Sequence, residues 1–461
     1  MTTCIDRRRE FAAIRDRLKQ PSSLSLIYGQ RRVGKSFLVR TAFEGGAGKR
    51  LCFQADESAT GALLSRFVWE AEAAGLLPPG VRPPDWSTAL TLVSQQAALN
   101  GEPTWLLLDE FQYLVDADPS LPSVVQRVVD QLAQRSRLHL ILCGSALGTM
   151  RALGDSSQPL HGRFDLQLKL LPFTYREVQE FVPTWSKPDA LRAFGIFGGL
   201  ARHLAMIDPS TSLERNIVTR LLDPLAALAE APVDQLRAER IGSRRDADAV
   251  LEAIALGENQ FGLIAARTGL TEQQLDVTLR ELVELEMVRK ERRYGDGPGA
   301  RFVRYRPSDP FTGFWFRLVR SSRALSFASG PELAYAERVG PRLPDHMGHV
   351  FEVVVRDALL AGRAGFVPDE LAAYWSRDGR TEIDWVVRSG SRVLLVECKW
   401  REQGPVGLDA LRQLRDHASR FPHGSGAELC LASATGFTPE VETMASLGEV
   451  LLIGPDVLFG G

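Results

Sequence analysis

The chain has 461 residues, of which 44% are hydrophobic and 24% charged, a composition typical of a soluble globular protein with about three domains. Its formal net charge of -2 gives no global attraction to nucleic acid, and its five scattered cysteines form neither a metal-ligand spacing nor a disulfide framework. No stretch approaches the ~20 apolar residues that span a bilayer and no signal-peptide core follows the first charges, so we expect a cytoplasmic protein without membrane contact.

A phosphate-binding loop follows the first apolar run, residues 24–28. Residues 29–36 have the Gly-x-x-x-x-Gly-Lys-Ser spacing, which carries this meaning between a strand and a helix, here predicted over 37–43. Backbone N–H groups and the helix dipole would then face the phosphates, while Lys35 reaches the β- and γ-phosphates and Ser36 binds Mg²⁺. Arg31 and Arg32 either touch phosphate or face solvent. The residues assigned to nucleotide binding here are Gly29, Gln30, Arg31, Arg32, Val33, Gly34, Lys35, Ser36 and Phe37.

An acidic pair, Asp109 and Glu110, ends the apolar run of residues 105–108. A buried parallel strand would deliver these acids to its carboxyl edge. We expect Asp109 to hold Mg²⁺, directly or through water, and Glu110 to polarise the attacking water, so the sequence predicts hydrolysis as well as binding. The alternative is a strand end with a solvated acidic pair.

Strands are expected at 24–28, 50–54, 104–108, 138–143 and 164–171, and helices between them indicate a parallel sheet covered on both faces. Ser145 follows the fourth strand, where it would sense the γ-phosphate or orient the water, or else cap the next helix. Arg163 precedes the fifth strand. There it would contact the γ-phosphate in cis or in trans, unless its role is structural.

Residues 28–36, 107–112 and 143–145 together resemble the archaeal-type ATPase family, which is related to the AAA+ enzymes and also occurs in bacteria. The resemblance covers roughly residues 5–240. It implies ATP and Mg²⁺ as cofactors, a P-loop NTPase core over 1–172 and a helical lid over 173–245. Residues 198–202 lack the proline that is usual in the lid element of this family, which puts a nucleotide-sensing role of the lid in doubt.

A winged helix is predicted over 246–308. Helices at 261–268 and 272–285, joined by a turn at Gly269 with Thr271 as N-cap, indicate a helix-turn-helix, and a hairpin at 287–293 and 301–306 forms the wing. The wing is basic enough to contact DNA phosphates, but the second helix is acidic, so an intramolecular switch is the alternative. The basic wing residues are Arg289, Lys290, Arg292, Arg293, Arg301, Arg304 and Arg306. A helical linker is expected over 309–345.

A second chemistry is predicted over 346–461, where one strand carries Asp384 and its hairpin partner carries Glu397 and Lys399. Alternation places Glu397 and Lys399 on one face. Asp384 and Glu397 would share a divalent metal ion, and Lys399 would orient the water or stabilise the developing charge. Glu352 on a preceding helix is a further acid for the metal, and Gln413 is a weaker accessory candidate. The alternative is a set of edge-strand charges.

This pattern resembles the PD-(D/E)xK nuclease superfamily, although the proline is absent. The expected fold is therefore α/β: a P-loop NTPase parallel sheet with a helical lid, then a winged helix and a restriction-endonuclease-like domain. The resemblance implies Mg²⁺, or Mn²⁺, at a nuclease-like site that acts on DNA. The leading hypothesis is an ATPase coupled to this site. The rival is an ATP-dependent switch that binds DNA or protein without cleavage, and homo-oligomers are compatible with both.

Overall fold

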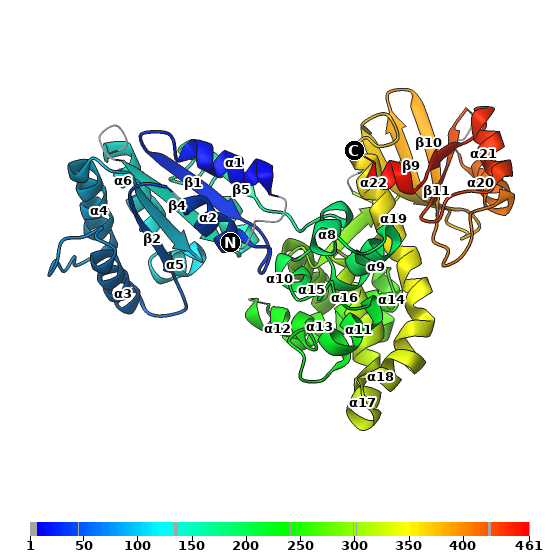
Figure 1. Ribbon diagram of the computed structural model, residues 1–461, viewed down its shortest axis with the longest axis horizontal. Coiled ribbons are helices and arrows are strands. Elements are labelled where there is room, and N and C mark those ends of the chain that lie inside the picture. The colour runs from blue at the N-terminus through cyan, green and yellow to red at the C-terminus, as the bar shows by residue number, and fades with distance from the viewer. Residues whose placement is uncertain are drawn as a thin grey trace. The chain divides into compact units, whose positions relative to one another are not determined.

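The computed structural model describes residues 7–44, 46–132, 137–239, 241–297, 299–300, 302–422 and 426–460. The chain divides into two compact units (Figure 1). We call Met1–Pro172 with Leu200–Arg202 the N-terminal unit, and Phe173–Gly199 with His203–Gly461 the C-terminal unit. Each contains its own β-sheet, and the chain is an α/β protein as expected.

The N-terminal unit is built on a five-stranded sheet of order β2-β3-β4-β1-β5, in which every neighbouring pair is parallel. The strands are β1 (Ser23–Tyr28), β2 (Lys49–Gln54), β3 (Thr104–Asp109), β4 (Leu138–Gly144) and β5 (Leu166–Lys169). The central strands are almost wholly buried because helices cover both faces of the sheet. This arrangement confirms the parallel sheet that the sequence predicted.

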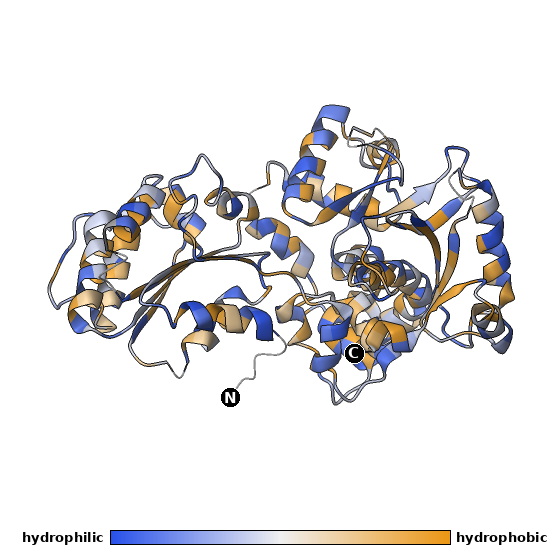
Figure 2. Ribbon diagram, turned by 90° about the horizontal axis from the view of Figure 1, so that it is seen from above, coloured by the Kyte–Doolittle hydropathy of each residue, from blue (hydrophilic) through white to orange (hydrophobic). Residues whose placement is uncertain are grey.

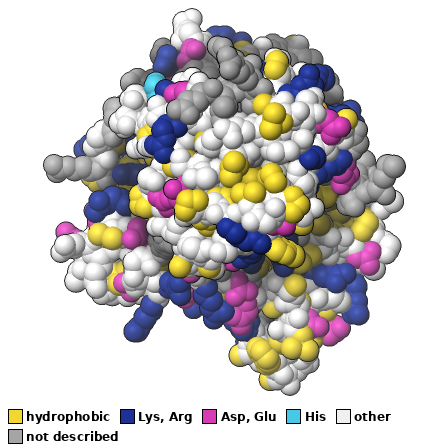
Figure 3. Space-filling view, turned by 90° about the vertical axis from the view of Figure 1, so that its left-hand side faces the viewer, with side chains coloured by type: hydrophobic (Ala, Val, Ile, Leu, Met, Phe, Trp, Pro, Cys, Tyr) yellow, Lys and Arg dark blue, Asp and Glu magenta, His cyan; other side chains and the backbone are white. Residues whose placement is uncertain are grey.

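Alternation along the strands divides the core into two layers. One layer joins Leu107 and Ile141 to α1 (Arg8–Arg17) and α2 (Lys35–Phe43). The other joins Leu108 and Leu142 to the remaining helices. Those helices are α3 (Thr60–Ala73), α4 (Trp86–Asn100), α5 (Phe111–Ala117), α6 (Leu121–Leu132) and α7 (Leu147–Ala152). The face in Figure 3 mixes basic, acidic and small hydrophobic groups among its described side chains.

The C-terminal unit begins with helices and contains the predicted helix-turn-helix and hairpin. The first helices are α8 (Tyr175–Phe181), α9 (Lys187–Phe197), α11 (Leu213–Ile217), η1 (Val218–Leu222) and α12 (Ala231–Ala238), while α10 (Ala201–Leu204) starts in the N-terminal unit. The next are α13 (Arg244–Ala255), α14 (Phe261–Thr268), α15 (Glu272–Glu284), β6 (Val288–Arg292) and β7 (Val303–Pro307). Thr271 caps α15 and forms a capping box with Gln274. The predicted wing residue Arg301 lies outside the described residues.

A run of helices leads from the hairpin to the second sheet. These are α16 (Pro310–Phe314), η2 (Trp315–Val319), α17 (Arg320–Ser329), α18 (Pro331–Ala334), η3 (Tyr335–Val339), η4 (Gly340–Arg342) and α19 (Leu343–Leu360). The aromatic residues Phe311, Phe314, Trp315 and Phe316 at the start of this run are buried. The Trp315 indole N–H donates to the Ala229 carbonyl at 2.9 Å, which fixes the linker to the preceding helices.

The second sheet has the order β12-β11-β10-β9-β8 and mixes antiparallel pairs (β8 to β10) with parallel pairs (β10 to β12). Its elements are β8 (Glu370–Trp375), β9 (Glu382–Ser389), β10 (Arg392–Lys399), α20 (Leu408–Arg420), β11 (Glu428–Ser433), α21 (Pro439–Ser446), β12 (Leu451–Ile453) and α22 (Pro455–Phe459). Figure 2 shows its apolar strands in orange. Leu411 and Leu414 of α20 pack on Val386 and Leu395, so this helix is amphipathic and also faces the sheet.

Asp309 explains the two glycines at 198 and 199. The Gly199 N–H donates to Asp309 Oδ1 at 3.4 Å, and a Cβ at Gly198 would lie 2.2 Å from the same oxygen. Gly198 also has φ +70, a conformation that L residues rarely adopt. Burial raises the pKa of the Asp309 carboxyl to about 7. The absence of side chains at Gly198 and Gly199 therefore allows the Asp309 carboxyl group to pack directly against their backbone.

Stability should fall as the pH rises through the pKa of Asp309. A folded-state pKa near 7, above an unfolded value of about 3.9, means that the folded protein binds the proton more tightly. This contribution is fully present below about pH 4 and is lost through pH 7, by at most about 4 kcal/mol. Urea unfolding from pH 4 to 8 should show the free energy of unfolding of the wild type falling relative to Asp309→Asn. Parallel curves would contradict the assignment, and the exposed Glu337→Gln should behave as wild type.

Candidate functional site

The phosphate-binding loop lies between β1 and α2, at the carboxyl edge of the parallel sheet. Two of its positions require glycine: a Cβ at Gly29 would lie 2.3 Å from the Leu170 carbonyl oxygen, and Gly34 has φ +101 where it begins α2. Arg32 also has a positive φ, of 68°. No side chain caps the first N–H groups of α2, which have no intrahelical acceptors. The loop therefore presents free backbone donors to an anion.

Lys35 is buried inside this loop. Its ammonium donates to the carbonyls of Gly29 and Gln30, each at 2.9 Å. Burial lowers its pKa, an effect opposed by the charges of Glu110 and Asp109. A desolvated ammonium beside open backbone donors is the electrostatic arrangement that a polyphosphate requires.

The acidic pair lies at the end of β3, beside the loop. Glu110 has φ 54, and its Oε2 accepts from Ser145 Oγ at 2.7 Å, from the Ser145 N–H at 3.2 Å and from Gln112 Nε2 at 2.6 Å. Burial opposes ionisation, but the hydrogen bonds from Gln112 and Ser145 and the charge of Lys35 hold the pKa of Glu110 below its usual value. Glu110 is therefore a fixed carboxylate, and the solvated-pair alternative is wrong for it.

Ser145 belongs to this network rather than to the next helix. The N-cap of α7 is Ala146, so the alternative that Ser145 caps that helix is wrong. Gln112 was not assigned a role from the sequence, although it lies two residues after Glu110 in the same strand-end motif. It donates to both Glu110 and Ser145, the latter at 3.3 Å. A γ-phosphate contact by Ser145 stays a prediction.

The residues present fit a magnesium ion. Asp109 is 3% exposed at the strand end and faces the same region as Lys35. The Ser36 hydroxyl is half-buried in the first turn of α2 and has no hydrogen-bond partner among the described residues. Carboxylate and hydroxyl oxygens are ligands that Mg²⁺ accepts beside phosphate. Phe37 is 45% exposed on the same turn, whereas Val33 is buried in the core.

Arg163 does not reach the loop of its own chain, so its predicted action in cis is wrong. The N–H of Asp165, two residues further on, bonds to the Leu24 carbonyl, near the amino end of β1. At about 3.3 Å per residue, the five residues from Leu24 to Gly29 separate it from the loop by roughly 16 Å. Arg163 instead makes a bidentate pair with Asp130, at 2.8 and 2.9 Å. Action in trans stays a prediction.

The segment Leu200–Arg202, which the sequence analysis placed in the helical lid, contacts the phosphate-binding loop. It clusters with the N-terminal unit, where Leu200 packs in the same layer as Val33. The Arg202 N–H donates to the Arg32 carbonyl at 3.3 Å, and Ala201 Cβ lies 3.5 Å from where a Gly34 Cβ would be. This contact depends on long-range packing, so the sequence alone does not reveal it. The glycine pair at 198 and 199 was the one sequence signal that this segment is close-packed.

Glu110→Gln should separate hydrolysis from binding. The amide keeps the shape of the side chain but cannot polarise water as a carboxylate does, so we expect ATP hydrolysis to fall about 10²–10³-fold. ATP affinity should change only a few-fold, because Lys35 and the loop amides are untouched. Steady-state phosphate release and calorimetric ATP titration measure the two effects. Exposed Glu102→Gln is the matched control, and full activity of Glu110→Gln would exclude this base.

A second site lies at the ends of β9 and β10. Asp384 Oδ2 accepts from the Cys398 N–H at 2.7 Å, which places it beside Glu397 on the neighbouring strand. Lys399 Nζ donates to Glu397 Oε1 at 2.8 Å and to Gln413 Oε1 of α20 at 3.2 Å. The structure thus brings together Asp384, Glu397 and Lys399, and it joins the accessory candidate Gln413 to them.

Burial raises the pKa of Asp384 well above its usual value, and the charges of Glu352 and Glu397 raise it further. Glu352 of α19 is near enough to act through its charge, and Arg306 pairs with it at 3.6 Å. No group of three or more Asp, Glu, His or Cys side chains in the described part of the chain has the geometry to hold a metal ion. Asp384 and Glu397 fit a cation as two oxygen donors.

Four arginines of the wing, for which both DNA contact and an intramolecular role were predicted, pair with carboxylates inside the C-terminal unit. Arg289 and Arg306 pair with Glu291 at 2.7 and 2.9 Å, Arg293 pairs with Asp296, and Arg304 pairs with Glu382. Lys290 and Arg292 are the exposed cations of β6. Most of the charge predicted to contact phosphates is therefore neutralised within the C-terminal unit.

A parallel sheet with a phosphate-binding loop after one strand and an acidic pair after another defines a P-loop ATPase. Residues 4–207 match a family described as an ATPase domain predominantly from Archaea. Residues 315–411 match a family of archaeal and bacterial proteins of unknown function. Within the described ranges, no helix combines the length and apolar character needed to cross a bilayer.

Similar proteins come from several archaea. An uncharacterised protein of Methanocaldococcus jannaschii is 22% identical over 407 residues, which cover 86% of this chain and 88% of that protein. The Walker-type ATPase of Pyrococcus abyssi is 19% identical, with a TM-score of 0.48 over 68% of this chain and 96% of that one. The ORC2 protein of Aeropyrum pernix is 16% identical, with a TM-score of 0.46 over 71% of this chain and 96% of that one.

Proposed function

We propose that the N-terminal ATPase domain hydrolyses ATP with Mg²⁺ and controls a metal-dependent, nuclease-like site that acts on DNA. Lys35 and the loop amides would hold the phosphates, Asp109 and Ser36 the ion, and Glu110 the attacking water. The observation that carries the hydrolytic half is the network that fixes the Glu110 carboxylate beside Lys35.

The nuclease-like half of the proposal is supported by Asp384, Glu397 and Lys399. Their carboxylates crowd one another and would gain from a shared cation, as the raised pKa of Asp384 indicates. A bound divalent ion would supply Lewis acidity and an activated water. The Lys399 ammonium, already directed by Glu397 and Gln413, would offset charge on the phosphate oxygens.

Residues 198–202 support the coupling between the two activities. Gly199 is held by Asp309 within the C-terminal unit, and the residue that follows it packs behind the phosphate-binding loop in the N-terminal unit. A shift of the loop between nucleotide states would therefore be passed along the chain to Asp309.

A second candidate is a switch that binds DNA or protein without cleaving it. Two observations favour it: the wing arginines are internally paired, and no three-ligand metal group is present among the described residues. In this case ATP would rearrange the winged helix and expose its surface.

Incubation with supercoiled plasmid and Mg²⁺ or Mn²⁺, with and without ATP, distinguishes the two candidates. The enzyme proposal expects nicked or linear DNA to form only when the metal ion is present. ATP should change the rate of cleavage by the wild type, whereas the rate of cleavage by Glu110→Gln should not depend on ATP turnover. Two results together would favour the switch over the enzyme. The first is that no DNA is cleaved under any condition. The second is that DNA binding requires ATP, is lost in Lys35→Ala and is kept in Asp384→Asn.

A further inference from the structure

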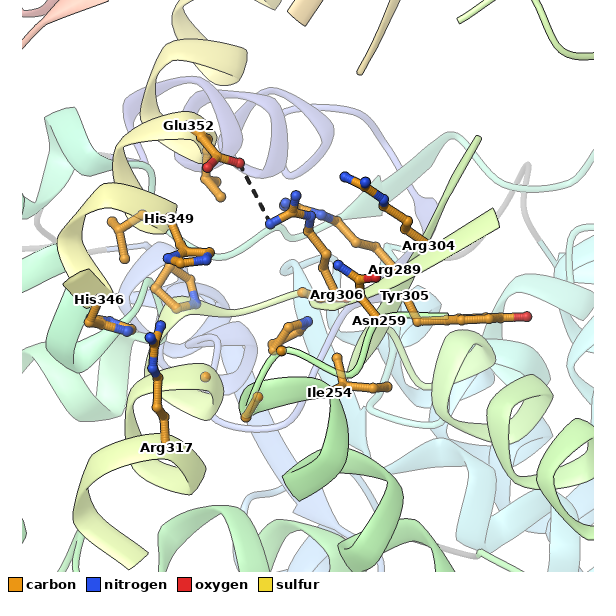
Figure 4. A pocket seen from close by; sticks show the side chains of 18 of the residues that line it. Ile254, Asn259, Arg289, Arg304, Tyr305, Arg306, Arg317, His346, His349 and Glu352 are labelled. Carbon is orange, nitrogen blue, oxygen red and sulfur yellow. Dashed lines mark ion pairs between the residues drawn. The ribbon is translucent and has the colours of Figure 1, made fainter. Parts of the chain in front are cut away.

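A cavity of about 310 Å³ lies within the C-terminal unit, between the wing hairpin, the start of the linker helices and α19. Figure 4 shows its labelled side chains converging from these elements. This volume is within the range of small-molecule sites in proteins. The cavity belongs to neither the phosphate-binding loop nor the Asp384 site, although Glu352 on its wall also acts on Asp384 through its charge.

The charges on the cavity wall are unequal. Four guanidinium groups line it, from Arg289, Arg304, Arg306 and Arg317, against the carboxylates of Glu352 and Glu382. Glu291, just outside, pairs with Arg289 and Arg306. The carboxyl of Asp309 also lines the cavity, and burial raises its pKa to about 7, so it offers only a partial negative charge near neutrality. The wall therefore keeps an excess of positive charge.

Of the four arginines that line the cavity, Arg317 is the one that is not paired with a carboxylate among the described residues. Among the residues that the structure describes, its side chain makes no hydrogen bond or ion pair. In Figure 4 its guanidinium points toward the two histidines of α19, ending beside His346 and below His349, on the side of the cavity away from Arg304. His349 is exposed, and its Nδ1 contacts the Asp345 carbonyl at 2.9 Å.

Arg304 supplies a second, independent sign of an unfilled contact. Its Nε is buried and has no hydrogen-bond partner among the described residues, while its guanidinium stacks on Trp375 at 4.2 Å and pairs with Glu382. A buried donor without an acceptor is costly, so such a group usually faces a ligand or water. The apolar residues Ile254 and Val350 are also among those that line the cavity.

We propose that this cavity binds a nucleotide-sized molecule through a phosphate monoester, with the phosphate held by Arg317 and His349 and the remainder lying along the apolar wall toward Arg304. Guanidinium groups bind phosphate through paired hydrogen bonds, and a phosphate monoester carries close to two negative charges at neutral pH. The phosphate could belong to a free nucleotide or to the phosphorylated end of a DNA strand, which share this chemistry. The site is independent of the proposed cleavage activity.

Calorimetric titration of the full chain in the Lys35→Ala background tests the proposal, because the phosphate-binding loop is then disabled. The probes are AMP, adenosine, and a short DNA strand with and without a 5′-phosphate. We expect the phosphorylated probes to bind, and their unphosphorylated partners to bind at least tenfold more weakly. Tighter binding of AMP identifies the free nucleotide as the source, and tighter binding of the phosphorylated strand identifies the strand end.

Arg317→Ala should weaken the phosphorylated probe at least tenfold, and His349→Ala, a change at an exposed position that should not disturb folding, should weaken it several-fold. Arg338→Ala, at an exposed arginine of η3 outside the cavity, should bind as the parent does. No phosphorylated probe binding more tightly than about 1 mM would overturn the proposal. Equal affinity in the parent and in His349→Ala and Arg317→Ala would overturn it as well.

Discussion

Lys35→Ala should abolish ATP hydrolysis, lowering its rate by at least about a hundredfold, and should also weaken ATP binding. The ammonium is buried and is held by the Gly29 and Gln30 carbonyls, where it would meet the β- and γ-phosphates. Its removal takes away a positive side chain inside the loop whose position is fixed by two backbone contacts. Phosphate release and calorimetric titration with ATP and Mg²⁺ measure the loss.

The control for this variant is Lys19→Ala, which removes an exposed lysine of the same unit that pairs with Asp16 on the surface. It should keep both activity and affinity. Because a desolvated ammonium is costly, Lys35→Ala should also unfold at the same temperature as the wild type or higher. Unchanged hydrolysis in Lys35→Ala would remove the loop from the mechanism.

Asp384→Asn should abolish any metal-dependent DNA cleavage, by at least about a hundredfold, while leaving ATP hydrolysis unchanged. The amide has the same shape and can still accept from the Cys398 N–H. It loses the negative charge that would attract the cation. Plasmid nicking with Mn²⁺ and phosphate release, measured on one preparation, report the two activities.

Measuring the stability of Asp384→Asn tests whether a loss of cleavage could come from unfolding. Burial and the charges of Glu352 and Glu397 disfavour the Asp384 carboxylate, so a neutral side chain should keep or raise the thermal midpoint. Asp378→Asn, in the exposed turn between β8 and β9, is the matched control and should cleave as the wild type does. Cleavage that persists in Asp384→Asn would place the nuclease-like chemistry elsewhere.

The phosphate-binding loop could be predicted because its geometry is set by consecutive residues. Gly29 and Gly34 permit the backbone path, and the flanking strand and helix follow from local apolar patterns. The pairing of Asp384 with Glu397 was equally accessible, since hairpin register fixes which residues lie side by side. The network of Glu110, Gln112 and Ser145 required the parallel order of β3 and β4.

Arg163 and Arg306 show what the sequence could not predict. Guanidinium groups are long and flexible, and their sequence positions do not say which carboxylates they will meet. Asp130 lies 33 residues from Arg163, and Glu352 lies far from Arg306 in the chain, so neither pair leaves a local pattern. Four of the basic residues predicted for the wing pair with carboxylates inside the C-terminal unit, whereas Lys290 and Arg292 stay exposed.

The amino-acid sequence by itself determined the nucleotide chemistry and the acid–lysine hairpin, because short-range backbone geometry and strand alternation fix both. Only the tertiary structure decided which arginines remain free, how Asp309 seats the glycine pair, and where the cavity beside Arg317 opens. These features depend on contacts between segments distant in the chain, where burial and charge pairing, rather than residue spacing, set the outcome.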